Sequence, residues 1–178
     1  MMKLNLDVCL RLPEEEYDSF LKLLDSGIGN NADSIRNSAG ITLTDCMNDS
    51  MLGKYVPEYI PEGMKLQYAY IYYYLDNDTG NKLYTKGIDI AFEDKENPAV
   101  YYGITVTWAE EYGRNGWAGT VISSDELSLD TIEKYMDEEE KMINLGVLME
   151  DVHVIFSSRG LGSEDILKIL FKNFSGKN

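Results

Sequence analysis

Two strand-like segments joined by a turn-forming segment constrain the fold of this chain most. From Leu66 to Leu75, tyrosine recurs at every second position, and a second apolar segment extends from Tyr84 to Phe92. Between them, residues 76–81 read Asp-Asn-Asp-Thr-Gly-Asn, a composition typical of turns. Period-two patterns on both sides of a turn predict an antiparallel hairpin. We therefore expect an antiparallel sheet at the centre of the fold.

The tyrosines of the first segment are predicted to form a ladder on one face of their strand. If the hairpin centres near Thr79, the facing pairs are expected to be Tyr74 with Tyr84, Tyr72 with Lys86, Tyr70 with Ile88, and Tyr68 with Ile90. In this register the ladder shares the inward face of the sheet with Ile88, Ile90 and Phe92.

This ladder has two interpretations, which the sequence leaves open. It can be core packed under a helix, or it can line a partly open amphipathic groove. A buried hydroxyl without a partner costs about 1–3 kcal/mol, and tyrosine offers broad contact at low entropic cost. For the groove, the predicted ligand-binding residues are Tyr68, Tyr70, Tyr72, Tyr74, Tyr84 and Lys86.

The remaining patterns complete an α+β fold with an antiparallel sheet of five or more strands and a helix packed on one face. The expected elements are a strand over 3–12, a helix from Pro13 to Gly27, a loop over 28–40, a short strand near 41–43, an antiparallel strand pair over 100–108 and 117–122, a helix over 129–143, a strand over 152–156, and a closing helix after Ser163 with Ile166, Leu167, Leu170, Phe171 and Phe174 on its apolar face. Residues 1–54 are expected to form an N-terminal strand-helix extension and loop. Residues 55–178 form the sheet domain with its C-terminal helix, and the two parts make one compact unit.

Composition excludes several classes of partner. The chain has 178 residues and a net charge of −15, and its acidic residues are spread along its length. Binding to nucleic acid or directly to an anionic membrane requires a cluster of Lys and Arg, which the sequence lacks. No segment approaches the ~18–20 apolar residues of a membrane span. Cys9 and Cys46 can be a disulfide or two thiols, and the sequence leaves this open.

No catalytic or metal-binding pattern emerges, so we expect no enzyme activity, no cofactor and no metal. His153 is the single histidine, and its place within an apolar strand favours a structural role. Residues 76–81 resemble half of a calcium loop, but Gly87 stands where the closing Glu would be needed. The acidic segment from Asp137 to Glu140 is interpreted as a solvated helix face. A pair of carboxylates acting as a hydrolase stays open, because 31 acids make spacing uninformative.

Three segments resemble a known family. They are Tyr55–Gly63, with prolines at 57 and 61, Ile88–Glu93, and Ser163–Leu170. Over residues 55–174 the chain looks like a Firmicutes family of uncharacterised extracytoplasmic domains, which occur in membrane-anchored anti-sigma-factor-like proteins and lipoproteins. The resemblance implies a curved antiparallel sheet backed by helix, a role in binding or sensing, and a location at the cell envelope.

The expected function is therefore a non-enzymatic, extracytoplasmic module that binds a protein, a peptide or a small amphipathic ligand. One alternative is a cytoplasmic protein-interaction or immunity-type protein, which is favoured if Met1 is the native start. The other is the carboxylate-pair hydrolase.

Overall fold

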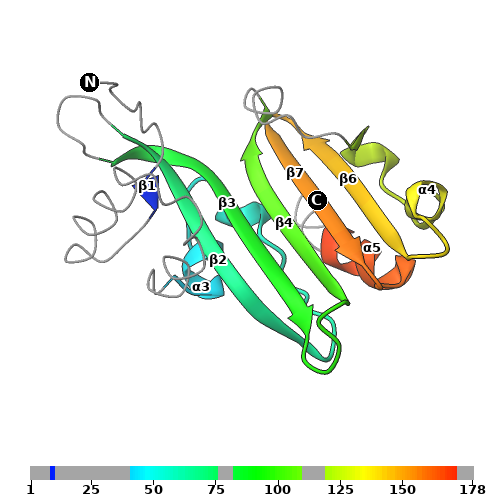
Figure 1. Cartoon of the computed structure of the whole chain (residues 1–178). Coiled ribbons are helices and arrows are strands. Elements are labelled where there is room, and N and C mark those ends of the chain that lie inside the picture. Colours follow the sequence, from blue (N-terminus) through cyan, green and yellow to red (C-terminus); the bar gives the residue numbers. More distant parts are fainter. Residues whose placement is uncertain (1–8, 11–40, 76–81, 110–118, 172–178) are drawn as a thin grey trace, which may run out of the picture.

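The computed structural model describes residues 9–10, 41–75, 82–109 and 119–171. In these residues one sheet is accompanied by short helices (Figure 1). The strands are β1 (Cys9–Leu10), β2 (Met64–Leu75), β3 (Lys82–Asp94), β4 (Tyr101–Trp108), β5 (Thr120–Ser123), β6 (Met142–Met149) and β7 (Val152–Arg159). The helices are α3 (Leu43–Met47), α4 (Leu129–Tyr135) and α5 (Ser163–Phe171), with 3-10 turns η2 (Gly53–Tyr55) and η4 (Ser124–Glu126). The helix predicted over 13–27, the loop over 28–40 and most of the strand predicted over 3–12 lie outside the described residues.

The described strands form one seven-stranded sheet in the order β1-β2-β3-β4-β7-β6-β5. Every neighbouring pair is antiparallel except β5 and β6. Figure 1 shows the sheet curving and twisting from β2 at one side to β6 at the other. The predicted α+β class and the hairpin of β2 with β3 are confirmed.

The antiparallel strand pair predicted over 100–108 and 117–122 is wrong. β4 pairs with β3 and β7, whereas β5 lies at the far edge of the sheet beside β6. β5 and β6 are parallel, and η4 and α4 make the connection between them. Parallel neighbours need a crossover segment rather than a tight turn, and α4 supplies it.

The helix predicted over 129–143 ends at Tyr135, and its second half is a turn followed by β6. Asp137 accepts backbone N–H bonds from Glu139 and Glu140. Lys141 has a φ of 48°, a left-handed conformation that no helix continues through. The acidic segment from Asp137 to Glu140 is therefore an exposed turn and not a helix face.

The core lies on one face of the sheet, here called the inner face. It is represented by a row of buried residues that crosses all the long strands: Ile71, Ile88, Val106, Val154, Val147 and Ile122. Buried residues of the helices join the same cluster, among them Cys46 of α3, Ile132 of α4 and Ile169 of α5. Figure 1 shows α3 near β2, with α4 and α5 near β6 and β7.

Two details of the helices differ from the sequence-based expectation. The short strand predicted over 41–43 is instead the start of α3, which Thr42 caps through a reciprocal bond pair with Asp45. In α5, Ile166, Ile169 and Leu170 are buried, but Phe171 is 52% exposed and so lies off the apolar face. Phe174 lies outside the described residues. Cys46 is buried in the core, whereas the side chain of Cys9 is not described.

The centre of the inner face holds a stack of aromatic rings. Tyr102 lies between Phe92 and Phe156, with ring centroids 4.8 and 6.0 Å apart. Its hydroxyl and that of Ser158, the residue facing it on β7, are buried and have no hydrogen-bond partner among the described residues. Burial raises the pKa of Tyr102 far above its ordinary value. Nearby, the Tyr59 hydroxyl donates to Asp165 at 3.1 Å and links the segment before β2 to α5.

Candidate functional site

The predicted tyrosine ladder lies on the face opposite the core, here called the outer face. A row across this face contains Tyr70, Asp89, Thr105, Ile155, Gly146 and Val121. The rings of Tyr68 and Tyr70 are 5.3 Å apart, and those of Tyr70 and Tyr72 are 6.0 Å apart. These three rings form a continuous aromatic surface along β2.

The predicted register of the ladder is wrong by one residue. Tyr72 faces Gly87, Tyr70 faces Asp89 and Tyr68 faces Ala91, so the ladder does not share a face with Ile88, Ile90 and Phe92. The cause is a register shift: Tyr73 faces Thr85, as a hairpin centred near Thr79 requires, but Tyr72 faces Gly87. Lys86 is the extra residue, and one extra residue moves the side chains that follow to the opposite face, until a second register shift between Leu66 and Tyr68 restores the original pairing.

The predicted ligand-binding residues differ in how accessible they are. Tyr70 is only 3% exposed, whereas Tyr68, Tyr72 and Lys86 are half-buried. Tyr74 and Tyr84 belong to β2 and β3, but their side chains lie outside the described residues. A ligand on this face can therefore reach the rings of Tyr68 and Tyr72, with Tyr70 supporting them from between.

Small residues lie beside the accessible end of the ladder. Tyr68 faces Ala91 on β3, Ala91 faces Gly103 on β4, and Gly103 faces Ser157 on β7. A Cβ atom added at Gly103 would meet only the backbone oxygen of Ile90, at 3.8 Å. The outer face therefore has unfilled space at Gly103, across a single small residue from the Tyr68 ring.

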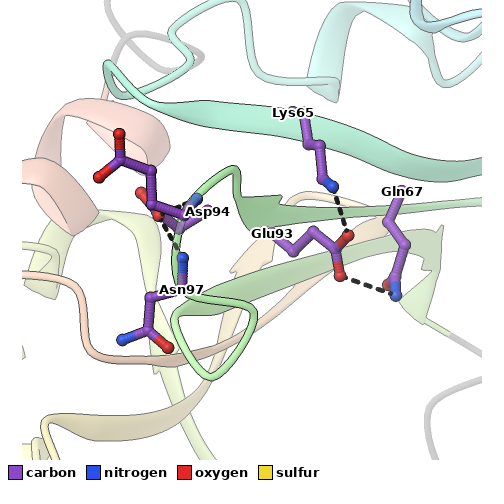
Figure 2. Close-up of polar contacts among 6 residues, drawn as sticks. Lys65, Gln67, Glu93, Asp94 and Asn97 are labelled. Atoms are coloured by element: carbon purple, nitrogen blue, oxygen red, sulfur yellow. Dashed lines mark hydrogen bonds and ion pairs between the residues drawn. The ribbon is translucent and has the colours of Figure 1, made fainter.

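A polar cluster flanks the same end of β2 and was not predicted from the sequence. Figure 2 shows Glu93 between Lys65, whose Nζ lies 3.1 Å from Oε1, and Gln67, whose Nε2 donates to Oε2 at 3.3 Å. The next residue, Asp94, accepts backbone N–H bonds from Glu96 and Asn97, both at 2.8 Å. These two bonds lower the pKa of Asp94. Asp94 thus closes the turn after β3, and the Lys65–Glu93 ion pair places charged groups beside this end of the ladder.

His153 lies on the outer face, between Thr107 of β4 and Leu148 of β6. It is 1% exposed. Burial lowers the pKa of its imidazole below the ordinary value of 6.5, so the ring is neutral at neutral pH. A buried, neutral ring within a strand agrees with the structural role predicted from the sequence.

Replacing His153 with Leu should flatten the pH dependence of stability below neutrality. The unfolded chain takes up a proton at His153 as the pH falls through 6.5, and the folded protein does so only at lower pH. The stability that the neutral ring contributes is therefore present above pH 6.5 and is lost as the pH falls toward the folded-state pKa.

The measurement is the melting temperature of both proteins between pH 7.5 and 5, a window that lies above the ordinary pKa values of 3.8 for Asp94 and 4.5 for Glu126. Since His153 is the single histidine, a wild-type melting temperature as flat as that of His153→Leu would contradict the expectation.

Several of the described carboxylates, among them Asp45, Asp94 and Glu126, close turns or cap helices. Asp94 and Glu126 both have a lowered pKa, the latter because it accepts the backbone N–H and the hydroxyl of Ser123. Among the described residues, no group of three or more His, Cys, Asp or Glu side chains is arranged to hold a metal ion. The segment over 76–81, which resembles half of a calcium loop, lies outside the described residues.

Comparisons with known proteins give no relatives. No family model matches the chain, and neither the curated proteins nor the solved structures contain a significant match. Within the described residues, no helix is both long and apolar enough to span a membrane.

Proposed function

We propose that this protein is a non-enzymatic binding module that takes a peptide or a small amphipathic ligand on the outer face of its sheet. The observation that carries the proposal is the unfilled space at Gly103, which Ala91 separates from the half-buried Tyr68 on the same face. Tyrosine rings give large contact areas with little loss of entropy, and their hydroxyls orient polar partners.

The polar cluster supports the same placement. Lys65, Gln67 and Glu93 lie next to the accessible ladder end, where they can bond to the polar groups of a ligand lying against Tyr68. Interfaces commonly combine an aromatic centre with a polar rim of this kind. Asp94 and Glu126, whose pKa values are lowered, accept backbone N–H bonds in turns, so neither of these two is suited to act as the general acid of a carboxylate pair.

The test is a selection of peptides from a random library on the wild-type protein, followed by affinity measurements on variants. Gly103→Val fills the space beside Tyr68, and Tyr68→Ser removes the ring. Each should weaken the selected peptides at least about tenfold, the equivalent of about 1.4 kcal/mol. Both variants should keep their melting temperature within a few degrees, because neither residue is part of the core.

Tyr135→Ser is the matched control, since Tyr135 is an exposed tyrosine on α4 at the other side of the sheet. It should bind the selected peptides as the wild type does. Peptides that bind Gly103→Val and Tyr68→Ser as tightly as the wild type would place the binding surface elsewhere and overturn the proposal.

The cell envelope is the location that we propose for this module, because of the resemblance of residues 55–174 to extracytoplasmic domains. A cytoplasmic interaction or immunity-type protein is the alternative. The genomic sequence upstream of Met1 distinguishes them: an encoded leader or membrane span supports the envelope, and a stop codon directly before Met1 contradicts it.

A further inference from the structure

The two side edges of the sheet differ in how they are protected. At one side edge, the part of β2 that does not pair with β1 is the outermost segment. It carries a charged residue, Lys65, and a register shift between Leu66 and Tyr68, both of which discourage pairing with another strand. At the opposite edge, β5 reads Thr-Val-Ile-Ser and contains no charge and no proline. Among the described residues, β5 pairs with β6 alone, so its outer edge carries no strand.

Exposed apolar side chains accompany this unprotected edge. Val121 of β5 is 39% exposed, and Leu148 of β6 is 42% exposed. Val121 faces Gly146, and Leu148 lies two residues beyond Gly146 on the same face, so the two side chains are diagonal neighbours. Gly146 has no side chain to separate Val121 from Ile155 of β7. The edge therefore continues into an apolar surface.

The charges around this edge select the kind of partner. The described residues from Thr120 to Asp151 contain two lysines, Lys134 and Lys141, and many more acids. Asp125 lies two residues after the end of β5, Asp130 lies in the first turn of α4, and the acidic turn over 137–140, in which Glu140 pairs with Arg159, precedes β6. All of these carboxylates are exposed. These exposed carboxylates attract cations and repel an acidic chain.

We propose that β5 is a docking edge for an extended, cationic segment of a partner protein, which adds to the sheet as a further strand. Main-chain hydrogen bonds to β5 supply affinity, an apolar side chain of the segment contacts Val121, and flanking Lys or Arg residues face the acids. The four residues of β5 set the length that can pair. β5 and the tyrosine ladder on β2 lie at opposite sides of the sheet. The two proposals therefore fail or succeed separately.

The experiment uses a labelled synthetic peptide of alternating Lys and Val with blocked ends, titrated with the full-length protein and followed by fluorescence anisotropy. Val121→Lys adds a positive charge and removes the apolar contact, and it should weaken binding at least about tenfold. Leu66→Lys is the matched control. It makes the same change of charge at a residue of nearly equal exposure, 38%, on β2 at the far side of the sheet, and its affinity should stay within about twofold of the wild type.

Two further peptides test the mode of binding on the wild-type protein, with no need for a variant to fold. A version that is N-methylated along its main chain keeps the charge but loses its N–H donors, and it should bind at least about tenfold more weakly. The corresponding Glu–Val peptide should not bind. The proposal is overturned if the Lys–Val peptide does not bind, if the methylated or acidic peptide binds as tightly, or if Leu66→Lys and folded Val121→Lys lose affinity equally.

Discussion

Truncating the chain after Gly162 should leave a protein that does not fold. α5 contributes Ile166, Ile169 and Leu170 to the core, and each is fully buried. Burying a side chain of this size stabilises a protein by about 1.5–3 kcal/mol, so the three together approach the ~5–15 kcal/mol of a typical domain. Circular dichroism and thermal unfolding measure the effect, and a truncated chain with an unchanged melting temperature would show that α5 is not part of the core.

Point variants separate the loss of packing from the loss of chain. Ile169→Ala should cost about 2–5 kcal/mol, because it leaves a cavity under the sheet. Phe171→Ala, in the same helix, should cost less than about 0.5 kcal/mol, since Phe171 is largely exposed. Similar losses in the two variants would mean that the two faces of α5 are assigned incorrectly.

Gly53→Ala should destabilise the protein by about 1–3 kcal/mol or more. Gly53 begins η2 and is buried against the end of α3. An added Cβ atom would lie 2.4 Å from the backbone oxygen of Met47 and 2.9 Å from that of Cys46. Backbone atoms cannot move aside as a flexible side chain can, so α3 and η2 have to separate. Urea denaturation monitored by tyrosine and tryptophan fluorescence gives the free energy of unfolding.

Gly162→Ala is the matched control for Gly53→Ala, because it makes the same chemical change where an added Cβ atom meets nothing within 4 Å. It should be neutral, or stabilise by about 0.4–1 kcal/mol through the lower entropy of the unfolded chain. If both glycine variants lose the same free energy of unfolding, contact with α3 is not the cause.

The elements with the strongest alternation were predictable from the sequence. β2, β3, β7 and α5 were expected because each carries an apolar pattern over one clear period. β6 was missed although Ile143, Leu145 and Val147 alternate, because the helical spacing of Ile132 and Met136 was extended too far. α4 stops because Met136 is extended, with ψ 133°, and the turn into β6 ends at Lys141 in a left-handed conformation; neither residue type signals this.

The candidate site was only partly predictable, and the reason is register. The tyrosines were identified correctly as one face of a strand, but the extra residue Lys86 moved them to the opposite side of the sheet from the one predicted. No pattern of residue types marks such a shift. The Lys65–Glu93 ion pair lies beyond a second register shift, between Leu66 and Tyr68, where the pairing returns to that of a hairpin centred near Thr79. The predicted register therefore allowed this pair, and it was missed because the cross-strand pairs were followed only from Tyr74 to Tyr68.

The pairing of β4 with β7 has a consequence for the order of folding. β2, β3 and β4 are successive neighbours, and β6 and β7 are joined by a tight turn, so each group can assemble from contacts close in sequence. β4 and β7 are separated by the whole segment that holds β5, α4 and β6. Because contacts distant in sequence carry a larger entropy of loop closure, we expect the pairing of β4 with β7 to form late and to limit the folding rate.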